Sequence, residues 1–177
     1  MTQRTVLVIN SGSSSIKYQL VDPDSGASLA SGLVERIGEE TGAITHKHGE
    51  ERTEITEPVP DHGFGLSEVL RLFEEQGPSL ADAHIVAVGH RVVQGGRYFS
   101  GPALIDDDVV ARIEQLVPLG PLHNPAHLKG IEVGRRLLSD VPHVAVFDTA
   151  FLQELPEAPA RHAPDREVAA THPLRRH

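Results

Sequence analysis

Cysteine is absent from this sequence of 177 residues. Without thiols the chain can form neither a disulfide-stabilised scaffold nor a zinc site built from thiolates. Long apolar runs are also absent, and the run near the amino terminus extends only from Val6 to Ile9. A secretory signal needs roughly 7–15 apolar residues and a membrane-spanning helix needs ~20. We therefore expect a soluble cytoplasmic protein with no membrane partner.

Positive charge is in short supply, with 16 Lys and Arg residues against 25 Asp and Glu residues and a net charge of −9. That balance argues against a nucleic-acid partner and against an anionic membrane surface. Any bound anion must therefore be held by a local site. Apolar residues make up 39% of the chain and charged residues 23%, which indicates a folded domain or one large lobe.

The first third of the chain shows strand patterns separated by turn residues. An apolar, β-branched run predicts a buried strand over 5–9, and alternation predicts a second strand over 16–21, with turn residues at 10–14 between them. Further strands are expected over 27–37 and on either side of the polar turn at 48–51. We expect these segments to form an antiparallel meander.

Helical patterns then alternate with short strands. A helical period runs from Leu66 to Phe73 and is stopped by Gly77-Pro78. After it we expect, in chain order, a buried strand over 84–88, a loop over 89–102, helices over 107–117 and 125–138, and a strand over 143–147. This order predicts an α/β lobe with a mixed sheet over residues 1–154, followed by a poorly patterned tail over 155–177.

The turn between the first two strands is the most informative segment, because it places Asn10, Gly12, three serines and Lys17 together. Turn amides, hydroxyls and a lysine can converge on phosphate oxygens, and glycine lets the backbone approach a ligand. The spacing from Gly12 to Lys17 suggests a P-loop, but the second glycine is missing and a strand follows the lysine. The segment predicts either a phosphate-binding hairpin or an ordinary serine-rich turn beside an exposed lysine.

Three further positions carry chemistry that fits an anion site. Arg91 follows a buried strand and precedes a pair of glycines, so its planar fork can bind carboxylate or phosphoryl oxygens; a surface ion pair is the alternative. His123 stands before a helix that starts with proline, although an ordinary turn histidine fits equally well. Asp148 ends a strand, which is a common place for a ligand-binding carboxylate and also for a helix N-cap.

Two histidines, His46 and His48, would lie on one face of a strand. A metal site there lacks an evident third ligand. We therefore expect these side chains to form part of a solvated surface.

Together, four segments resemble the motifs of the acetate kinase family, in the order that the family shows. These segments are Val6–Leu20, Val88–Arg97, Pro118–Ala126 and Val144–Phe151. The resemblance implies a ribonuclease-H-like α/β lobe of the superfamily that includes sugar kinases, actin and heat-shock ATPases. It also implies a reversible, Mg²⁺-dependent phosphoryl transfer in which ATP and acetate give ADP and acetyl phosphate.

The same resemblance assigns roles to the phosphate-binding hairpin. Asn10 would help to place Mg²⁺ through water. The terminal phosphates of ATP would be contacted by Gly12, Ser13, Ser14, Ser15 and Lys17.

On the acid side, the resemblance implies that Arg91 binds the substrate carboxylate or the transferring phosphoryl group and that His123 assists that group. Val93 and Leu122 would line a small pocket for the methyl group of acetate. Asp148 would be the catalytic carboxylate. Because a carboxylic acid with a pKa of about 4 is already ionised at neutral pH, we expect Asp148 to orient Arg91, a metal-bound water or acetate instead of removing a proton.

Departures from the family pattern limit these expectations. Family members continue into a second lobe that supplies the adenosine site, further phosphoryl-stabilising residues and most of a homodimer interface. We therefore expect this chain to be an amino-terminal half that is inactive alone. Gln94 stands where relatives usually carry histidine, and Leu152 replaces a frequent histidine or phenylalanine. The alternatives are a non-catalytic phosphate- and carboxylate-binding module and half of a propionate or butyrate kinase.

Overall fold

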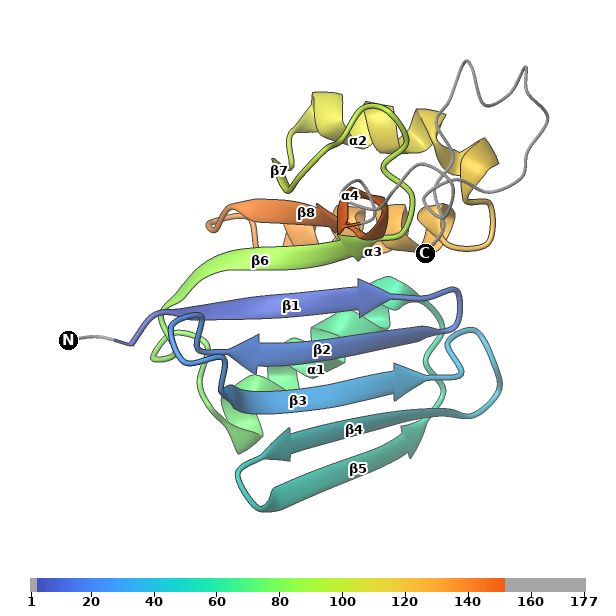
Figure 1. The fold of residues 1–177 in the computed structure, drawn as a ribbon. Helices are drawn as coiled ribbons and strands as arrows, with labels where there is room; N and C mark the ends of the chain where they lie inside the picture. Colours follow the sequence, from blue (N-terminus) through green and yellow to red (C-terminus); the bar gives the residue numbers. More distant parts are fainter. Residues whose placement is uncertain (1–2, 152–177) are drawn as a thin grey trace.

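The computed structural model describes residues 3–151, which form one continuous eight-stranded sheet with helices packed against it (Figure 1). The strand order is β5-β4-β3-β2-β1-β6-β8-β7. The strands are β1 Thr5–Ser11, β2 Ser15–Val21, β3 Ser28–Glu35, β4 Gly42–His48, β5 Glu51–Glu57, β6 Ile85–Val92, β7 Ala103–Leu104 and β8 His143–Phe147. The helices are α1 His62–Gln76, α2 Asp107–Gln115, α3 Asn124–Leu137 and α4 Asp148–Phe151, with a 3-10 turn, η1, at Val117–Leu119.

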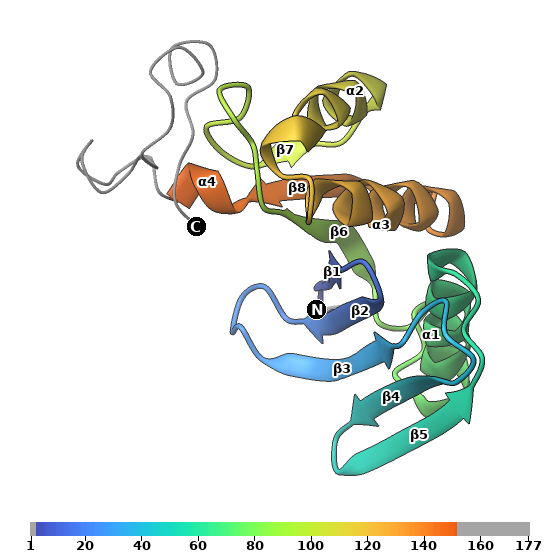
Figure 2. The same cartoon turned by 90° about the vertical axis from the view of Figure 1, so that its right-hand side faces the viewer.

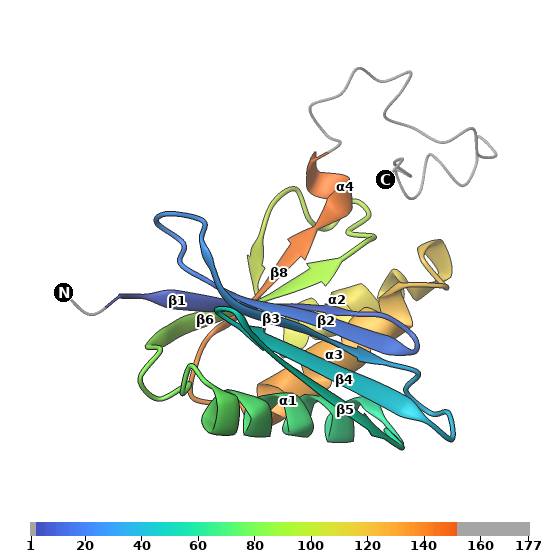
Figure 3. The ribbon, with the colours of Figure 1, turned by 90° about the horizontal axis from the view of Figure 1, so that it is seen from below.

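Strands β1 to β5 form the predicted antiparallel meander. In β2 the apolar residues Ile16, Tyr18 and Leu20 are buried, whereas Lys17 and Gln19 face solvent. The buried side faces α1, which lies across this face of the meander (Figure 3). The alternation in β2 therefore decides that Lys17 points to the open face of the sheet.

Strands β1, β6 and β8 run parallel, so their carboxyl ends meet at one edge of the sheet. Helix α3 packs against β1 and β6 on the same face as α1, and α2 lies against α3 (Figure 2). These elements confirm the predicted α/β lobe with a mixed sheet. They also bring the hairpin after β1 beside the end of β6.

The predicted loop over 89–102 is wrong in its first part, because β6 continues to Val92. Gly89 and His90 pair with β1, and Arg91 and Val92 pair with β8. Pairing on both sides therefore extends the strand through a glycine that weakens its local signal. The predicted tail over 155–177, its boundary at residue 154 and Leu152 lie outside the described residues.

Two aspartates start helices as caps. The carboxylate of Asp61 accepts a hydrogen bond from the amide of Phe64 at the start of α1, and that of Asp106 accepts one from Val109 at the start of α2, each at 2.8 Å. Such caps satisfy amides that have no partner inside the helix. Between residues 3 and 151, every helix is too short or too polar to cross a membrane.

Candidate active site

A pocket of about 280 Å³ lies at the carboxyl ends of β1 and β6, next to the start of α3. Its lining residues come from four different segments: Asn10, Gly12, Ser15, Lys17, Arg91, Val93, His123 and His127. Lys17 and Arg91 therefore share one cleft. The amino-terminal hairpin supplies one wall, and β6 with α3 supplies the other.

The hairpin wall is held by backbone and side-chain bonds. The amide of Gly12 donates to the carbonyl of Ser15 at 2.8 Å, and Nε2 of His62 bonds the Gly12 carbonyl at 2.7 Å. Asn10 and Lys17 are paired residues of β1 and β2, so their side chains lie on the same face. Helix α1 thus anchors the turn through His62, a residue that sequence reasoning missed.

Ser13 and Ser14 lie exposed at the tip of the turn, outside the pocket lining, whereas Ser15 lines it. Of the three serines, only Ser15 therefore lines the pocket. Phosphate binding by Ser13 and Ser14 stays a prediction.

Arg91 and Asp148 form a forked ion pair across adjacent strand ends. Nε of Arg91 lies 3.1 Å from both carboxylate oxygens, and one terminal nitrogen lies 2.7 Å from Oδ2. This bonding to Asp148 raises the pKa of Arg91. Arg91 keeps about half of its side chain exposed, so part of the guanidinium remains accessible to an anion. Asp148 is the first residue of α4, and its carboxylate contacts Arg91.

His123 precedes α3 and lines the pocket, as Val93 does. Val93 is buried, and the ring of His123 stacks on that of His127 with centroids 6.4 Å apart. Leu122 is 81% exposed and lies outside the pocket lining. Its expected contact with a substrate methyl group therefore has no support from the described residues and stays a prediction.

A buried clamp joins the end of β6 to the start of α3. The amide of Gln94 donates to Oδ1 of Asn124 at 3.2 Å, and Nδ2 of Asn124 donates to the Gln94 carbonyl at 3.1 Å. Oε1 of Gln94 accepts the amide of Gly96 at 3.0 Å. Gln94 thus stabilises the turn beside Arg91. Sequence reasoning missed Asn124 as the partner.

His127 is a second residue that sequence reasoning missed. It lies one helical turn after His123, so the spacing of four residues was an available signal. Its side chain is 4% exposed and lines the pocket. Burial lowers the pKa of His127 to about 4, and nearby Arg91 and His123 act in the same direction. The backbone of Ser11 and the carboxylate of Asp148 oppose this shift.

The expectation of a solvated surface at His46 is wrong, because this side chain is 1% exposed. Its Nδ1 bonds the hydroxyl of Tyr18 and its Nε2 bonds the carbonyl of Gly77, each at 2.8 Å. Nδ1 of His48 bonds the carbonyl of Gln76 at 3.1 Å. Both histidines therefore tie β4 to the end of α1. Over residues 3–151 no cluster of three or more His, Asp or Glu side chains suited to a metal ion occurs.

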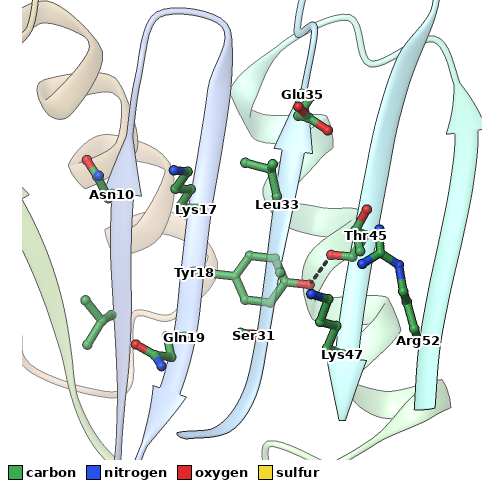
Figure 4. A pocket seen from close by; sticks show the side chains of 12 residues that line it. Asn10, Lys17, Tyr18, Gln19, Ser31, Leu33, Glu35, Thr45, Lys47 and Arg52 are labelled. Carbon is green, nitrogen blue, oxygen red and sulfur yellow. Dashed lines mark hydrogen bonds between the residues drawn. The ribbon is translucent and has the colours of Figure 1, made fainter. Parts of the chain in front are cut away.

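A wider hollow of about 480 Å³ lies on the open face of β1 to β5 (Figure 4). Lys47 and Arg52 line it together with Asn10 and Lys17 of the first pocket. A side chain on Gly32 would meet the Tyr18 hydroxyl at 2.2 Å, so glycine is required where Tyr18 passes beneath. Because Lys17 lines both the first pocket and this hollow, it is accessible from each of them.

Comparison with known proteins gives consistent matches along the chain. The family model of the Acetokinase family matches residues 5–177. An acetate kinase of Corynebacterium aurimucosum is 52% identical over 97% of this chain and 43% of its own length. An acetate kinase of Clavibacter michiganensis subsp. michiganensis is 54% identical over 97% of this chain and 43% of its own length. The chain therefore spans less than half the length of these relatives.

Two solved structures share a similar fold over most of this chain. The crystal structure of Porphyromonas gingivalis acetate kinase matches 98% of this chain and 44% of its own, with a TM-score of 0.85 and 38% identity. The crystal structure of a propionate kinase from Francisella tularensis subsp. tularensis SCHU S4 matches 95% of this chain and 43% of its own, with a TM-score of 0.82 and 38% identity. These matches agree with the resemblance seen in the four sequence motifs, and the chain belongs to the Acetokinase family.

Proposed function

We propose that this chain forms the phosphate- and acid-binding half of an acetate kinase, which transfers a phosphoryl group reversibly from ATP to acetate. The observation that carries the proposal is the single pocket that contains both Lys17 and Arg91. Phosphoryl transfer requires that two anions are held side by side and that their charge is neutralised. Cations on opposite walls of one pocket suit that task.

Acetate needs little activation as a nucleophile, because a carboxylic acid with a pKa of about 4 is ionised at neutral pH. The work of the site is therefore electrostatic. Lys17 would hold the terminal phosphates of ATP, and Arg91 would bind the acid or the transferring group. Asp148 would orient the guanidinium of Arg91 through the observed fork. His123 would contact the same group from the start of α3.

Asn10 offers a neutral amide to the pocket, and the described residues contain no carboxylate cluster for a metal. Mg²⁺ commonly keeps several waters and binds through substrate phosphates, so a single amide that contacts its water shell fits this ion. When bound with ATP, Mg²⁺ would neutralise phosphate charge. We propose Asn10 as a water-mediated ligand. By family, we also propose a cytoplasmic location and a homodimer.

Half of a propionate kinase is the second candidate, because a solved propionate kinase also matches this fold, at the same 38% identity as the solved acetate kinase. One methylene changes binding in an apolar pocket by only ~1–3 kcal/mol. Relative rates on acetate, propionate and butyrate decide between these acids. A binding module without turnover is the remaining alternative.

A chimera tests the proposed activity. This chain replaces the matching 43% of the Corynebacterium aurimucosum acetate kinase, and acyl phosphate formation is measured with ATP, acetate and Mg²⁺. We expect turnover, and we expect Arg91→Ala to abolish it. The intact relative serves as the positive control. A folded chimera that binds ATP and acetate without turnover would support the binding module instead.

A further inference from the structure

Among the residues that the structure describes, two buried polar side chains near the pocket have no hydrogen-bond partner. They are His127, at both ring nitrogens, and Ser11, at its hydroxyl. The Ser11 backbone lies close enough to affect the ring, but no hydrogen bond of normal geometry forms. Unpaired buried polar groups are rare in folded proteins because their desolvation goes uncompensated. Of the two, only His127 lines the pocket, and its unpaired ring nitrogens indicate a missing partner there.

Close packing places Ser11 against α3, near the helical turn that carries His127. Helix α3 approaches the end of β1 at Gly130, where an added side chain would come within 2.5 Å of the Ser11 Cβ. His127 lies one turn earlier on α3 and lines the pocket. The ring therefore stands between the hairpin, which holds Lys17, and β6, which holds Arg91.

At neutral pH the buried ring of His127 is uncharged. A neutral imidazole has one N–H donor and one acceptor nitrogen. Its donor can bond an anionic oxygen without adding a further positive charge beside Arg91. An oxyanion is thus a suitable missing partner.

We propose that His127 contacts the ligand directly and donates its ring N–H to an oxygen of the small oxyanion bound between the hairpin and Arg91. The oxyanion is a carboxylate or a phosphoryl group, the two chemistries that this pocket suits. The inference rests on the proposed function and adds a contact residue to that site.

Nitrogen-15 NMR of the histidine rings in this chain tests the contact, with acetate and inorganic phosphate titrated separately. We expect the His127 ring nitrogen signals to shift with one or both anions, and the two titrations show which oxyanion is recognised. His127→Gln, which keeps a donor, should bind within a few-fold of the parent. His127→Leu should bind at least about tenfold more weakly, since a hydrogen bond to a charged group is lost.

Thermal unfolding supplies a second measurement. Without ligand, His127→Leu should unfold at a higher temperature than the parent, because an apolar side chain of similar size removes unsatisfied groups. The control is His84→Asn, at the opposite end of β6 with a φ angle of 51°. Asparagine tolerates that conformation, and this variant should bind both anions like the parent.

The outcomes separate the inference from the proposed function. Anion binding that requires Arg91 but leaves the His127 signals and the His127→Leu affinity unchanged overturns the inference alone. Absence of binding by either anion to the folded parent chain counts against the acid site and the inference together. A shift of the His127 ring signals, together with weaker anion binding by His127→Leu, supports both the inference and the proposed acid site.

Discussion

The guanidinium of Arg91 and the carboxylate of Asp148 meet across the carboxyl ends of β6 and β8, with a shortest contact of 2.7 Å. Three hydrogen bonds fix the plane of the guanidinium. The pair is partly exposed, at 49% for Arg91 and 22% for Asp148. Exposed pairs contribute only about 0–1 kcal/mol to stability. The main role of this ion pair is therefore to orient Arg91, and its contribution to stability is small.

Replacing Asp148 with asparagine separates orientation from stability. In the chimera, we expect Asp148→Asn to lower turnover at least about tenfold. The neutral amide of asparagine replaces the charged carboxylate that aligns the Arg91 guanidinium. The free energy of unfolding should change by less than about 1 kcal/mol. Steady-state rates and urea unfolding measure the two effects.

Asp108→Asn is the matched control for that prediction, since Asp108 pairs with Arg112 on the surface of α2. It should leave turnover unchanged. Equal rates for Asp148→Asn and the parent would contradict the orienting role.

Gly130→Ala tests the close approach of α3 to β1. The new methyl group would lie 2.5 Å from the Cβ of Ser11, so the helix must shift. We expect a loss of ~1–3 kcal/mol in the free energy of unfolding, measured with urea. Gly101→Ala, where no atom of the described residues would lie within 4 Å of the new methyl group, should stay within about 0.5 kcal/mol of the parent. Equal losses in both variants would argue against tight packing at Gly130.

Asn124→Ala removes both side-chain bonds of the clamp to Gln94. Asn124 is fully buried, and the Gln94 amide and carbonyl would lose their partner. We expect a loss of ~2 kcal/mol in the free energy of unfolding, measured with urea. The chimera should also lose activity because the clamp positions His123. Full stability in this variant would mean that the clamp contributes little.

Acid should destabilise the chain through His90 and His143. Nε2 of His90 lies 2.9 Å from Nδ1 of His143, and Nε2 of His143 bonds the carbonyl of Leu138 at 2.8 Å. Burial, with a smaller effect of His143, lowers the pKa of His90 to about 3, and burial also lowers that of His143. Both rings are therefore neutral in the folded state near pH 7.

Below pH ~6.5 these two histidines bind protons in the unfolded chain but stay neutral in the folded chain. The free energy of unfolding should thus be highest above pH ~6.5 and fall as the pH drops toward 3, by a few kcal/mol at pH ~4. His90→Gln should flatten this dependence in urea titrations at several pH values. An unchanged slope would exclude His90 as its main source.

Local pattern predicted much of the first half of the fold. The alternation of β2 decided which face Lys17 occupies, because side chains of a strand point to opposite faces in turn. Short turns joined β1 to β5 in sequence order, so their antiparallel pairing needed no distant information. Local sequence signals also predicted the end of α1 at Gly77 and the end of β8 before Asp148.

The site itself depended on distant pairing. β6 continues to Val92 because β1 and β8 pair with it, and these strands come from widely separated parts of the chain. The burial of His46 and the exposure of Leu122 likewise follow from packing that no short window contains. His127 had a signal, its spacing from His123, but only the fold turned that face of α3 toward Ser11.

By itself, then, the order of residues determined the chemistry available: a serine-rich turn with a lysine, an arginine at a strand end and a histidine before a helix. The tertiary structure decided that these groups share one pocket, because parallel pairing of β1, β6 and β8 brings their carboxyl ends to a common edge. Within residues 3–151 it also decided which polar groups were left without partners, since burial is a property of the packed molecule.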